Sequence, residues 1–354
     1  MQRAIIVAGM HRSGTSALTR VINLLGADLP SNLLGSNLSN ALGHWESNDL
    51  IALHDEMLRA AGSSWNGLWT LAPSWFAGAG VDTFMSRIRE FVEREFPTSP
   101  LFVIKDPRIA LFIPVWQRAL DECGIEARVV LPFRSPLEVA ASLSRRAAKE
   151  NRGEVWPSDR GVLLWLRYVL SAERATRGCS RAFVGYDTLL DDWRGEVARL
   201  ETQLAVAWPR EPEEVAEMIE QFLSREHKNE VYRPDGAALT PNEALAMRVF
   251  RALDAAVKAP QGEVAAFDEA DDALTQAGAL VAGYVEALER ANDATRVALA
   301  TAQDDTRRWR DMAEQETAGR TAAEARVSAL EASTSWKLTK PLRFAVEKIQ
   351  PRRH

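Results

Sequence analysis

Short strand-like runs of apolar residues alternate with longer stretches of helical periodicity over roughly the first 230 residues of the chain. The runs are residues 4–8, 101–104, 128–134 and 181–186. A buried parallel strand has this pattern, and the crossover between two parallel strands contains a helix. The sequence therefore predicts an α/β fold, a three-layer α/β/α sandwich around a central parallel sheet.

The segments between these runs have apolar residues at helical spacing. They predict helices at residues 17–22, 50–61, 81–96, 109–123, 135–151, 158–177, 194–204 and 212–223. Residues 26–43 are instead rich in Asn, Ser, Leu and Gly, which predicts a long loop.

A loop with two glycines, Gly9 and Gly14, joins the first predicted strand to the first predicted helix. Backbone N–H groups at such a junction face outward at the positive end of the helix, where they bind phosphate or sulfate. The spacing of the two glycines fits a nucleotide P-loop, but the lysine that follows the second glycine in that motif is missing. The loop predicts a site for a small anion, and a glycine turn without a ligand is the alternative.

Residues 9–16, GMHRSGTS, resemble the 5′-phosphosulfate loop of the sulfotransferases that use 3′-phosphoadenosine 5′-phosphosulfate (PAPS). Residues 129–143 resemble the 3′-phosphate site of that family, which has an arginine at the end of a strand and a serine eight residues later. The two motifs stand in the family's order, and the resemblance covers roughly residues 1–230. It implies PAPS as sulfate donor, bound by Arg12, Ser13, Gly14, Thr15, Ser16, Arg134 and Ser142.

Lys105 follows a predicted strand directly, in the sequence Lys105-Asp106-Pro107-Arg108. The motif resembles the Lys-Asp-Pro sequence of tyrosylprotein sulfotransferases and of bacterial and glycan-modifying members, whose lysine lies near the bridging oxygen of the sulfate. The resemblance implies that Lys105 and Arg12 act catalytically by stabilising charge on the transferring group. A surface Lys-Asp pair is the alternative.

Transfer of a sulfuryl group to an alcohol needs a general base for the hydroxyl proton. The family uses a histidine or a glutamate, and Glu46, in the sequence GHWES at residues 43–47, resembles the glutamate type. His44 and His11 are competing bases, and Glu46 could instead be a carboxylate that favours a helix start. Residues 224–228, SREHK, stand where relatives close a basic loop over the nucleotide, which implies donor contacts by His227 and Lys228, although the usual glycines are absent.

Tryptophan is unusually dense between residues 45 and 76, at positions 45, 65, 69 and 75. Sugar rings can lie on aromatic faces, so this density favours a carbohydrate acceptor, whereas rings that fill the core are the alternative. The net charge of −6 argues against broad nucleic-acid binding, and the two cysteines, Cys123 and Cys179, have no metal spacing. The short N-terminal apolar run is needed as a strand and no membrane-length apolar run exists, so the expected location is cytoplasmic.

The chain changes character after residue 260. Residues 261–331 are rich in Ala, Glu, Asp, Arg and Thr and lack proline, which predicts a long helix. Its form stays open between a coiled coil that pairs two copies through residues 262–331, an arm packed on its own domain, and a partly disordered helix.

Residues 335–354 reverse the charge, with six Lys or Arg and one acid, and carry an apolar stripe. They predict a basic amphipathic tail that contacts an anionic membrane at its inner face; a helix docked on protein is the alternative. Residues 335–343 also resemble tails of bacterial cell-surface glycan enzymes.

Three segments follow from these patterns: a sulfotransferase domain at residues 1–258, a long helix or coiled coil at 259–334, and the basic tail at 335–354. The predicted function is transfer of a sulfuryl group from PAPS to a hydroxyl of a glycan or glycolipid, without a metal. A P-loop nucleotide kinase and an inactive nucleotide-binding scaffold are the competing functions.

Overall fold

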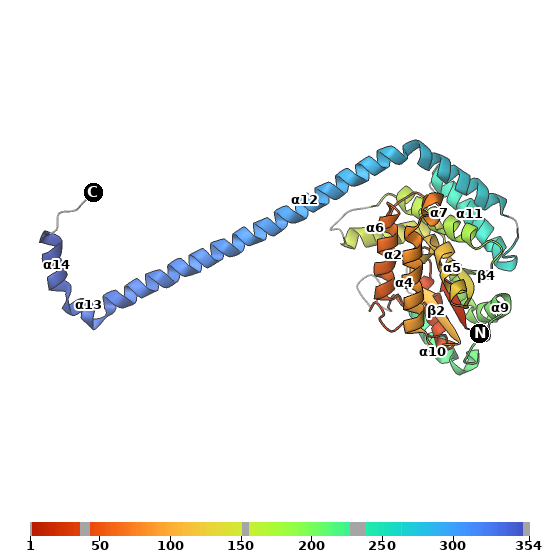
Figure 1. Cartoon of the computed structure of the whole chain (residues 1–354), viewed down its shortest axis with the longest axis horizontal. Helices are drawn as coiled ribbons and strands as arrows, with labels where there is room; N and C mark the ends of the chain where they lie inside the picture. Colours follow the sequence, from red (N-terminus) through yellow and green to blue (C-terminus); the bar gives the residue numbers. More distant parts are fainter. Residues whose placement is uncertain (1, 36–42, 151–155, 227–237, 263, 350–354) are drawn as a thin grey trace. The chain divides into compact units, whose positions relative to one another are not determined.

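The computed structural model describes residues 2–35, 43–150, 156–226, 238–262 and 264–349 (Figure 1). The chain divides into two compact units, Met1–Leu280 and Val281–His354. Within the described ranges, no helix combines the length and the apolar character needed to cross a membrane. Cys123 and Cys179 are free cysteines.

Four parallel strands form the sheet of the first unit, in the order β2-β1-β3-β4. They are β1 (Arg3–Val7), β2 (Leu101–Lys105), β3 (Glu126–Phe133) and β4 (Arg181–Gly185). The register pairs Val7 with Lys105 on one side and with Val130 on the other. The predicted α/β class with a parallel sheet is therefore confirmed.

Side chains of each strand alternate between the two faces of the sheet, and helices cover both faces. Ile5 and Val7 lie in one apolar cluster, whereas Ala4 and Ile6 lie in another. The first cluster includes residues of α1 (Thr15–Leu24), α9 (Trp193–Leu204) and α10 (Ala216–Glu226). The second includes residues of α4 (Gly80–Glu95), α5 (Ile113–Glu122), α7 (Ser158–Ala175) and α11 (Pro241–Lys258). The arrangement has three layers, as the sequence predicts.

The first unit contains further helical elements. They are α2 (Asn48–Ala60), α3 (Pro73–Phe76), η1 (Pro107–Leu111), α6 (Pro136–Glu150), α8 (Tyr186–Asp191) and η2 (Pro212–Glu214). The helix predicted at residues 109–123 is divided into η1 and α5. Pro114 explains the division, because a proline lacks an N–H and clashes with the carbonyl group four residues before it.

The long helix α12 (Ala265–Ala332) starts on the first unit. Three apolar side chains of its first turns, Phe267, Ala270 and Leu274, are buried in the core cluster. The prediction of a long helix is thus confirmed, whereas coiled-coil pairing stays a prediction.

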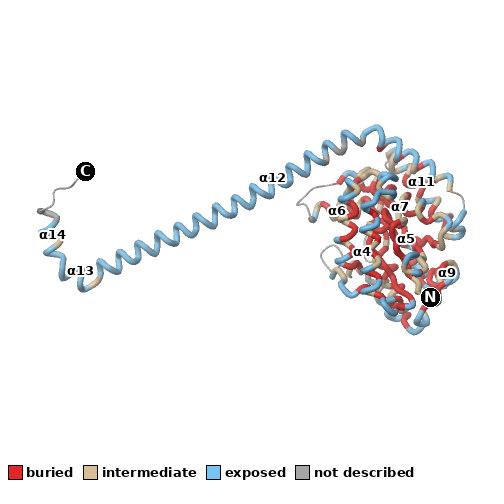
Figure 2. The backbone as a smooth tube through the Cα atoms, in the orientation of Figure 1, coloured by how far each residue is buried: buried red, intermediate tan, exposed pale blue. Residues whose placement is uncertain are grey.

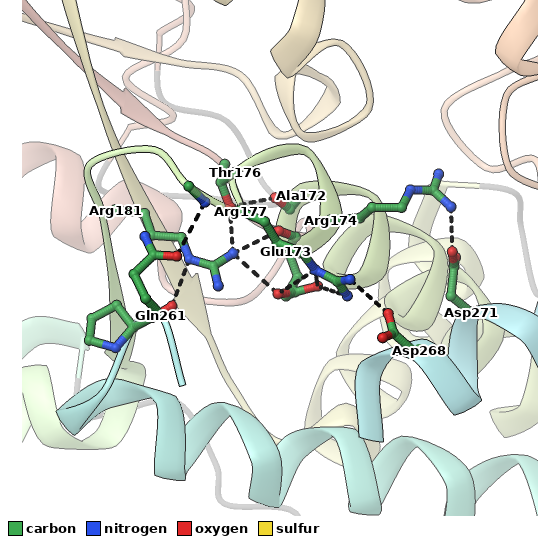
Figure 3. A network of polar contacts seen from close by, with 11 residues as sticks. Ala172, Glu173, Arg174, Thr176, Arg177, Arg181, Gln261, Asp268 and Asp271 are labelled. Atoms are coloured by element: carbon green, nitrogen blue, oxygen red, sulfur yellow. Dashed lines mark hydrogen bonds and ion pairs between the residues drawn. The ribbon is translucent and has the colours of Figure 1, made fainter. Parts of the chain in front are cut away.

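An ion network holds the segment that leads into α12 (Figure 3). The carboxylate of Glu173 is fully buried and accepts hydrogen bonds from Arg177 and Arg181. Arg177 also pairs with Asp268 of α12 at 2.7 Å, and Arg181 donates to the carbonyl oxygen of Pro260 at 2.8 Å. One buried carboxylate therefore links α7, β4 and the first turns of α12.

The second unit consists of the rest of α12 with α13 (Thr334–Leu338) and α14 (Lys340–Ile349). Its described residues are mostly exposed (Figure 2). Leu342 and Val346 of α14 remain 68% and 53% exposed. The guanidinium group of Arg343 lies 3.7 Å from the ring centroid of Trp336 and so joins α14 to α13.

Candidate active site

The carboxyl ends of the strands bring the predicted site residues to one edge of the sheet. Because β1 lies between β2 and β3, the glycine loop after β1 has Lys105 of β2 on one side and Arg134 after β3 on the other. Tyr186 follows β4 at the same edge. An open parallel sheet binds its ligands at this edge.

The glycine loop leads into α1, and the N-cap residue of α1 does not cap the backbone amides of the helix's first turn. That residue is Gly14, which has no side chain to accept from them. Ser13 is fully buried, and its Oγ has no hydrogen-bond partner among the described residues. Arg12 (φ 71°) and Gly14 (φ 83°) both have left-handed backbones. Outward-facing amides at the positive end of a helix, next to an unsatisfied hydroxyl, fit a bound anion.

Lys105 and Glu46 form a buried ion pair beside this loop. Nζ of Lys105 lies 2.5 Å from Oε1 of Glu46, and the two side chains are only 1% and 7% exposed. Nζ also donates to the carbonyl oxygen of His44 at 2.8 Å and to Oγ of Ser16 at 3.1 Å. An ammonium group has three hydrogens, so all of its donors have acceptors. The structure therefore brings together the predicted lysine, the predicted base and a loop serine.

A strained turn directs Glu46 at Lys105. Trp45 has φ 56°, which is uncommon for a bulky residue, and its ring lies under the guanidinium group of Arg20 at 4.6 Å. Ser47 is the N-cap residue of α2, so Glu46 precedes the helix and does not lie in its first turn. Within the described residues, the side chain of Glu46 contacts Lys105 rather than the first amides of α2.

The two segments that resemble donor-binding motifs touch each other. Nε of Arg12 donates to Oγ of Ser142 at 2.9 Å, although the two residues are 130 positions apart. Ser142 lies in α6 and is 8% exposed. The contact places the arginine of the loop next to the serine for which the family resemblance implies a 3′-phosphate contact.

Arg134 is held by two residues that sequence reasoning missed. Its Nε donates to Oε2 of Glu138 at 2.6 Å, and its guanidinium group lies 4.9 Å from the ring centroid of Tyr186. Tyr186 also packs on Gly14, where an added Cβ would lie 2.3 Å from the ring. Arg134 lies just before α6 and Glu138 lies in its first turn, so their four-residue spacing was a usable signal, as was the position of Tyr186 directly after a strand.

The solved structures of three sulfotransferases are similar to this chain. Sulfotransferase STF1 from Mycobacterium tuberculosis H37Rv has 17% sequence identity and a TM-score of 0.40, with 71% of this chain and 77% of that chain covered. The sulfotransferase domain from the curacin biosynthetic pathway has 16% identity and a TM-score of 0.40, with 71% and 98% covered. The sulfotransferase domain from the Synechococcus PCC 7002 olefin synthase has 16% identity and a TM-score of 0.35, with 71% and 94% covered.

No protein-family model and no curated protein matches the chain. Structural similarity at this level carries no argument about function.

The two histidines that compete with Glu46 have different surroundings. The ring of His11 is buried and meets the rings of Trp65 and Tyr168 edge-on, at 5.1 Å and 5.9 Å. Burial, together with the nearby charge of Arg108, lowers the pKa of His11 well below its usual range, so the ring is neutral at pH 7. His44 accepts from Lys105 through its backbone carbonyl.

Three of the four tryptophans between residues 45 and 76 have different neighbours. Trp65 stacks on Trp156 at 5.9 Å, and the ring of Trp75 lies 5.4 Å from that of Phe112, against the core. Trp45 lies beside Arg20. Trp75 therefore packs against the core, as in the alternative to a carbohydrate site. Trp65 instead lies beside His11 of the glycine loop.

Two predicted residues, His227 and Lys228, lie outside the described residues. Among the residues that are described, no group of three or more His, Cys, Asp or Glu side chains is placed to hold a metal ion. The site contains a glycine loop that can bind an anion and a buried lysine, Lys105, that contacts this loop. It also contains the carboxylate of Glu46, which pairs with Lys105. This set of groups can bind a phosphate or sulfate ester, stabilise negative charge and accept a proton.

Proposed function

We propose that the chain transfers a sulfuryl group from PAPS to a hydroxyl group of an acceptor. The observation that carries the proposal is the contact of Lys105 with both Glu46 and Ser16 at the start of α1. It puts a cation, a carboxylate and an anion-binding loop within hydrogen-bonding distance of one another. Sulfuryl transfer needs these three groups, and the resemblance of residues 9–16 and 129–143 to PAPS sites supports the choice of donor.

Arg12, Ser13 and the amides of residues 14–16 would hold the 5′-phosphosulfate. The Oγ of Ser13, which has no partner among the described residues, and the first-turn amides of α1 would supply the hydrogen-bond donors. Arg134 would bind the 3′-phosphate. Its terminal nitrogens make no hydrogen bond within the described residues, so they are available while Nε stays on Glu138.

Lys105 changes partners in the proposed reaction. It turns from Glu46 towards the bridging oxygen of the phosphosulfate, and Glu46 is then free to take the proton of the acceptor hydroxyl. A new bond forms between the acceptor oxygen and sulfur as the bond between sulfur and the bridging oxygen breaks. The electron pair leaves with 3′-phosphoadenosine 5′-phosphate, whose charge Lys105 and Arg12 stabilise.

Transfer of radiolabelled sulfate from PAPS to pooled hydroxyl-bearing glycans and glycolipids tests the proposal. We expect label in the acceptor pool with the wild type and a loss of about 100-fold or more with Arg12→Ala, because one donor to the developing charge is removed. Nucleotide binding without transfer to any acceptor would favour the inactive scaffold.

A P-loop nucleotide kinase is the second candidate. Lys105 reaches Oγ of Ser16 from β2 and so places beside the loop the lysine that the loop itself lacks. Incorporation of labelled γ-phosphate from ATP, with no incorporation of sulfate, would favour the kinase.

Alanine at position 14 is expected to weaken nucleotide binding about tenfold or more, equivalent to at least 1.4 kcal/mol. Gly14 has φ +83°, and an added Cβ would lie 2.3 Å from Tyr186, so the loop or the ring that supports Arg134 must move. Calorimetric titration with 3′-phosphoadenosine 5′-phosphate measures the change. Gly62→Ala is the matched control, since Gly62 has φ +66° with nothing within 4 Å. An equal loss of affinity in Gly62→Ala would contradict a local role for Gly14.

We also propose that the tail contacts an anionic membrane surface. Leu342 and Val346 are exposed and lie one turn apart on the same face of α14, while Phe344 points to the other side. The segment 335–354 carries six Lys or Arg against one acid, a charge that complements anionic lipid. A carbohydrate acceptor and pairing of two copies through residues 262–331 also stay proposals.

Vesicle flotation of the full chain tests the membrane contact. We expect flotation with anionic vesicles and not with neutral ones, and its loss in Leu342→Glu but not in Phe344→Glu, which has the same change of charge. Flotation that is unchanged when residues 335–354 are removed would contradict the proposal.

A further inference from the structure

Three polar contacts join residues 46–55, which lead into α2 and form its first half, to residues 105–108 at the end of β2 and directly after it. The first is the pair of Lys105 and Glu46. In the second, Nδ1 of His54 lies 2.8 Å from Oδ2 of Asp106. In the third, Nε of Arg108 lies 2.7 Å from Oδ1 of Asp55. The partners follow the same order along residues 46–55 and along residues 105–108. The two segments therefore contact each other through three pairs of side chains.

The middle contact is buried and rests on a charged carboxylate. His54 and Asp106 are both fully buried. Oδ1 of Asp106 accepts from the backbone N–H and from the guanidinium group of Arg108, both at 3.0 Å. Burial alone would raise the pKa of Asp106, but the charge of Arg108 and the hydrogen bond from His54 hold it well below its usual range. Asp106 is therefore an anion at all pH values near neutrality.

Trp116 determines which ring nitrogen of His54 carries the proton. Nε1 of Trp116 donates to Nε2 of His54 at 2.9 Å. An indole N–H can only donate, so Nε2 of His54 is an acceptor and the proton is on Nδ1. His54 therefore donates to Asp106, and Trp116, which is fully buried in α5, fixes the direction of that bond.

We propose that His54 is a positioning residue for the pair of Lys105 and Glu46. Asp106 is the residue after Lys105, so the hydrogen bond from His54 fixes the peptide that carries the lysine. His54 also lies in the helix that Glu46 precedes, so the same bond sets the separation of the two functional side chains. The effect on turnover rests on the proposed transfer reaction, whereas the placement of Lys105 does not.

Two variants of His54 separate positioning from general packing. In His54→Asn the amide nitrogen takes the place of Nδ1 and keeps the donation to Asp106, while the bond from Trp116 is lost. In His54→Gln the amide oxygen takes the place of Nε2 and keeps the bond from Trp116, while the donation to Asp106 is lost. Each variant gives up one buried hydrogen bond, so the two form a matched pair.

The first readout is the reactivity of Lys105 in the full chain, which needs no enzymatic activity. Reductive methylation followed by peptide mass spectrometry measures it, with the exposed Lys258 as internal reference. Lys105 is 2% exposed and should be protected in the wild type. We expect methylation of Lys105 to be about tenfold faster or more in His54→Gln, the effect of losing a hydrogen bond to a charged group, and close to the wild-type rate in His54→Asn.

The second readout separates turnover from donor binding. We expect kcat for sulfate transfer to fall in His54→Gln and to be largely retained in His54→Asn, with the Kd for 3′-phosphoadenosine 5′-phosphate unchanged in both. Equal protection of Lys105 in the two variants, or equal loss of protection, would overturn the positioning role. A difference in protection with no sulfate transfer by the wild type would support the positioning role and contradict the proposed reaction.

Discussion

Replacement of Lys105 by methionine is expected to lower the rate of sulfate transfer about 100- to 1,000-fold, the effect of removing one donor to a developing oxyanion. The reason is that Lys105 is a buried cation that reaches the loop at Ser16, where the phosphosulfate is proposed to bind. Methionine keeps much of the length of the lysine side chain and removes the charge. Initial rates with saturating PAPS measure the loss.

The same variant is expected to lose stability for a separate reason. Glu46 is 7% exposed, and without Lys105 its carboxylate is buried and unpaired, which costs about 3–5 kcal/mol. The double variant Lys105→Met/Glu46→Gln removes both charges and should recover much of the stability without recovering activity. Recovery of activity in the double variant would contradict the catalytic role of Lys105.

The Glu46→Gln variant is expected to lose about 100- to 10,000-fold in kcat, the usual contribution of a general base. The amide oxygen of glutamine can still accept from Nζ of Lys105, so the fold and the donor site should change little. The Kd for 3′-phosphoadenosine 5′-phosphate should therefore stay near the wild-type value. Parallel measurement of kcat and this Kd separates the loss of a base from the loss of a binding site.

His44→Gln and His11→Gln are the controls for the base. Glu46 contacts Lys105 directly, whereas the pKa of His11 is lowered by burial and its ring packs on Trp65. A fully active Glu46→Gln, together with an inactive histidine variant, would move the role of base to that histidine.

The sheet could be predicted because its strands are buried on both faces. Residues 5–7 have no exposed surface, and a strand of this kind reads as an unbroken apolar run. The prediction did not include α11, although its start has a recognisable signal. Thr240 and Glu243 cap each other's backbone groups there, and Pro241 takes the first helical position.

The loop and strand-end residues of the site could be predicted from local motifs, but their partners could not. The contact of Lys105 with Glu46 depends on the positive φ of Trp45. The pattern of apolar and polar residues does not predict this backbone conformation. His54 is 52 residues from Asp106 and reads in the sequence as an ordinary position of a helix. Long-range polar contacts of this kind depend on tertiary packing rather than on local propensity.

Nucleotide selectivity tests the proposed donor most directly. The measurement is a calorimetric titration of the wild type and Arg134→Ala with 3′-phosphoadenosine 5′-phosphate, ADP and ATP–Mg²⁺. Arg118→Ala is the matched control, because Arg118 is half exposed on α5 and pairs only loosely with Asp82 at 3.7 Å. A charge-assisted contact between Arg134 and the 3′-phosphate should make the 3′-phosphorylated nucleotide the preferred ligand.

A PAPS-dependent transferase predicts selective binding of 3′-phosphoadenosine 5′-phosphate by the wild type and by Arg118→Ala, with the selectivity lost in Arg134→Ala. An equal or stronger response to ATP–Mg²⁺, unaffected by Arg134→Ala, would contradict the proposed donor and favour the kinase.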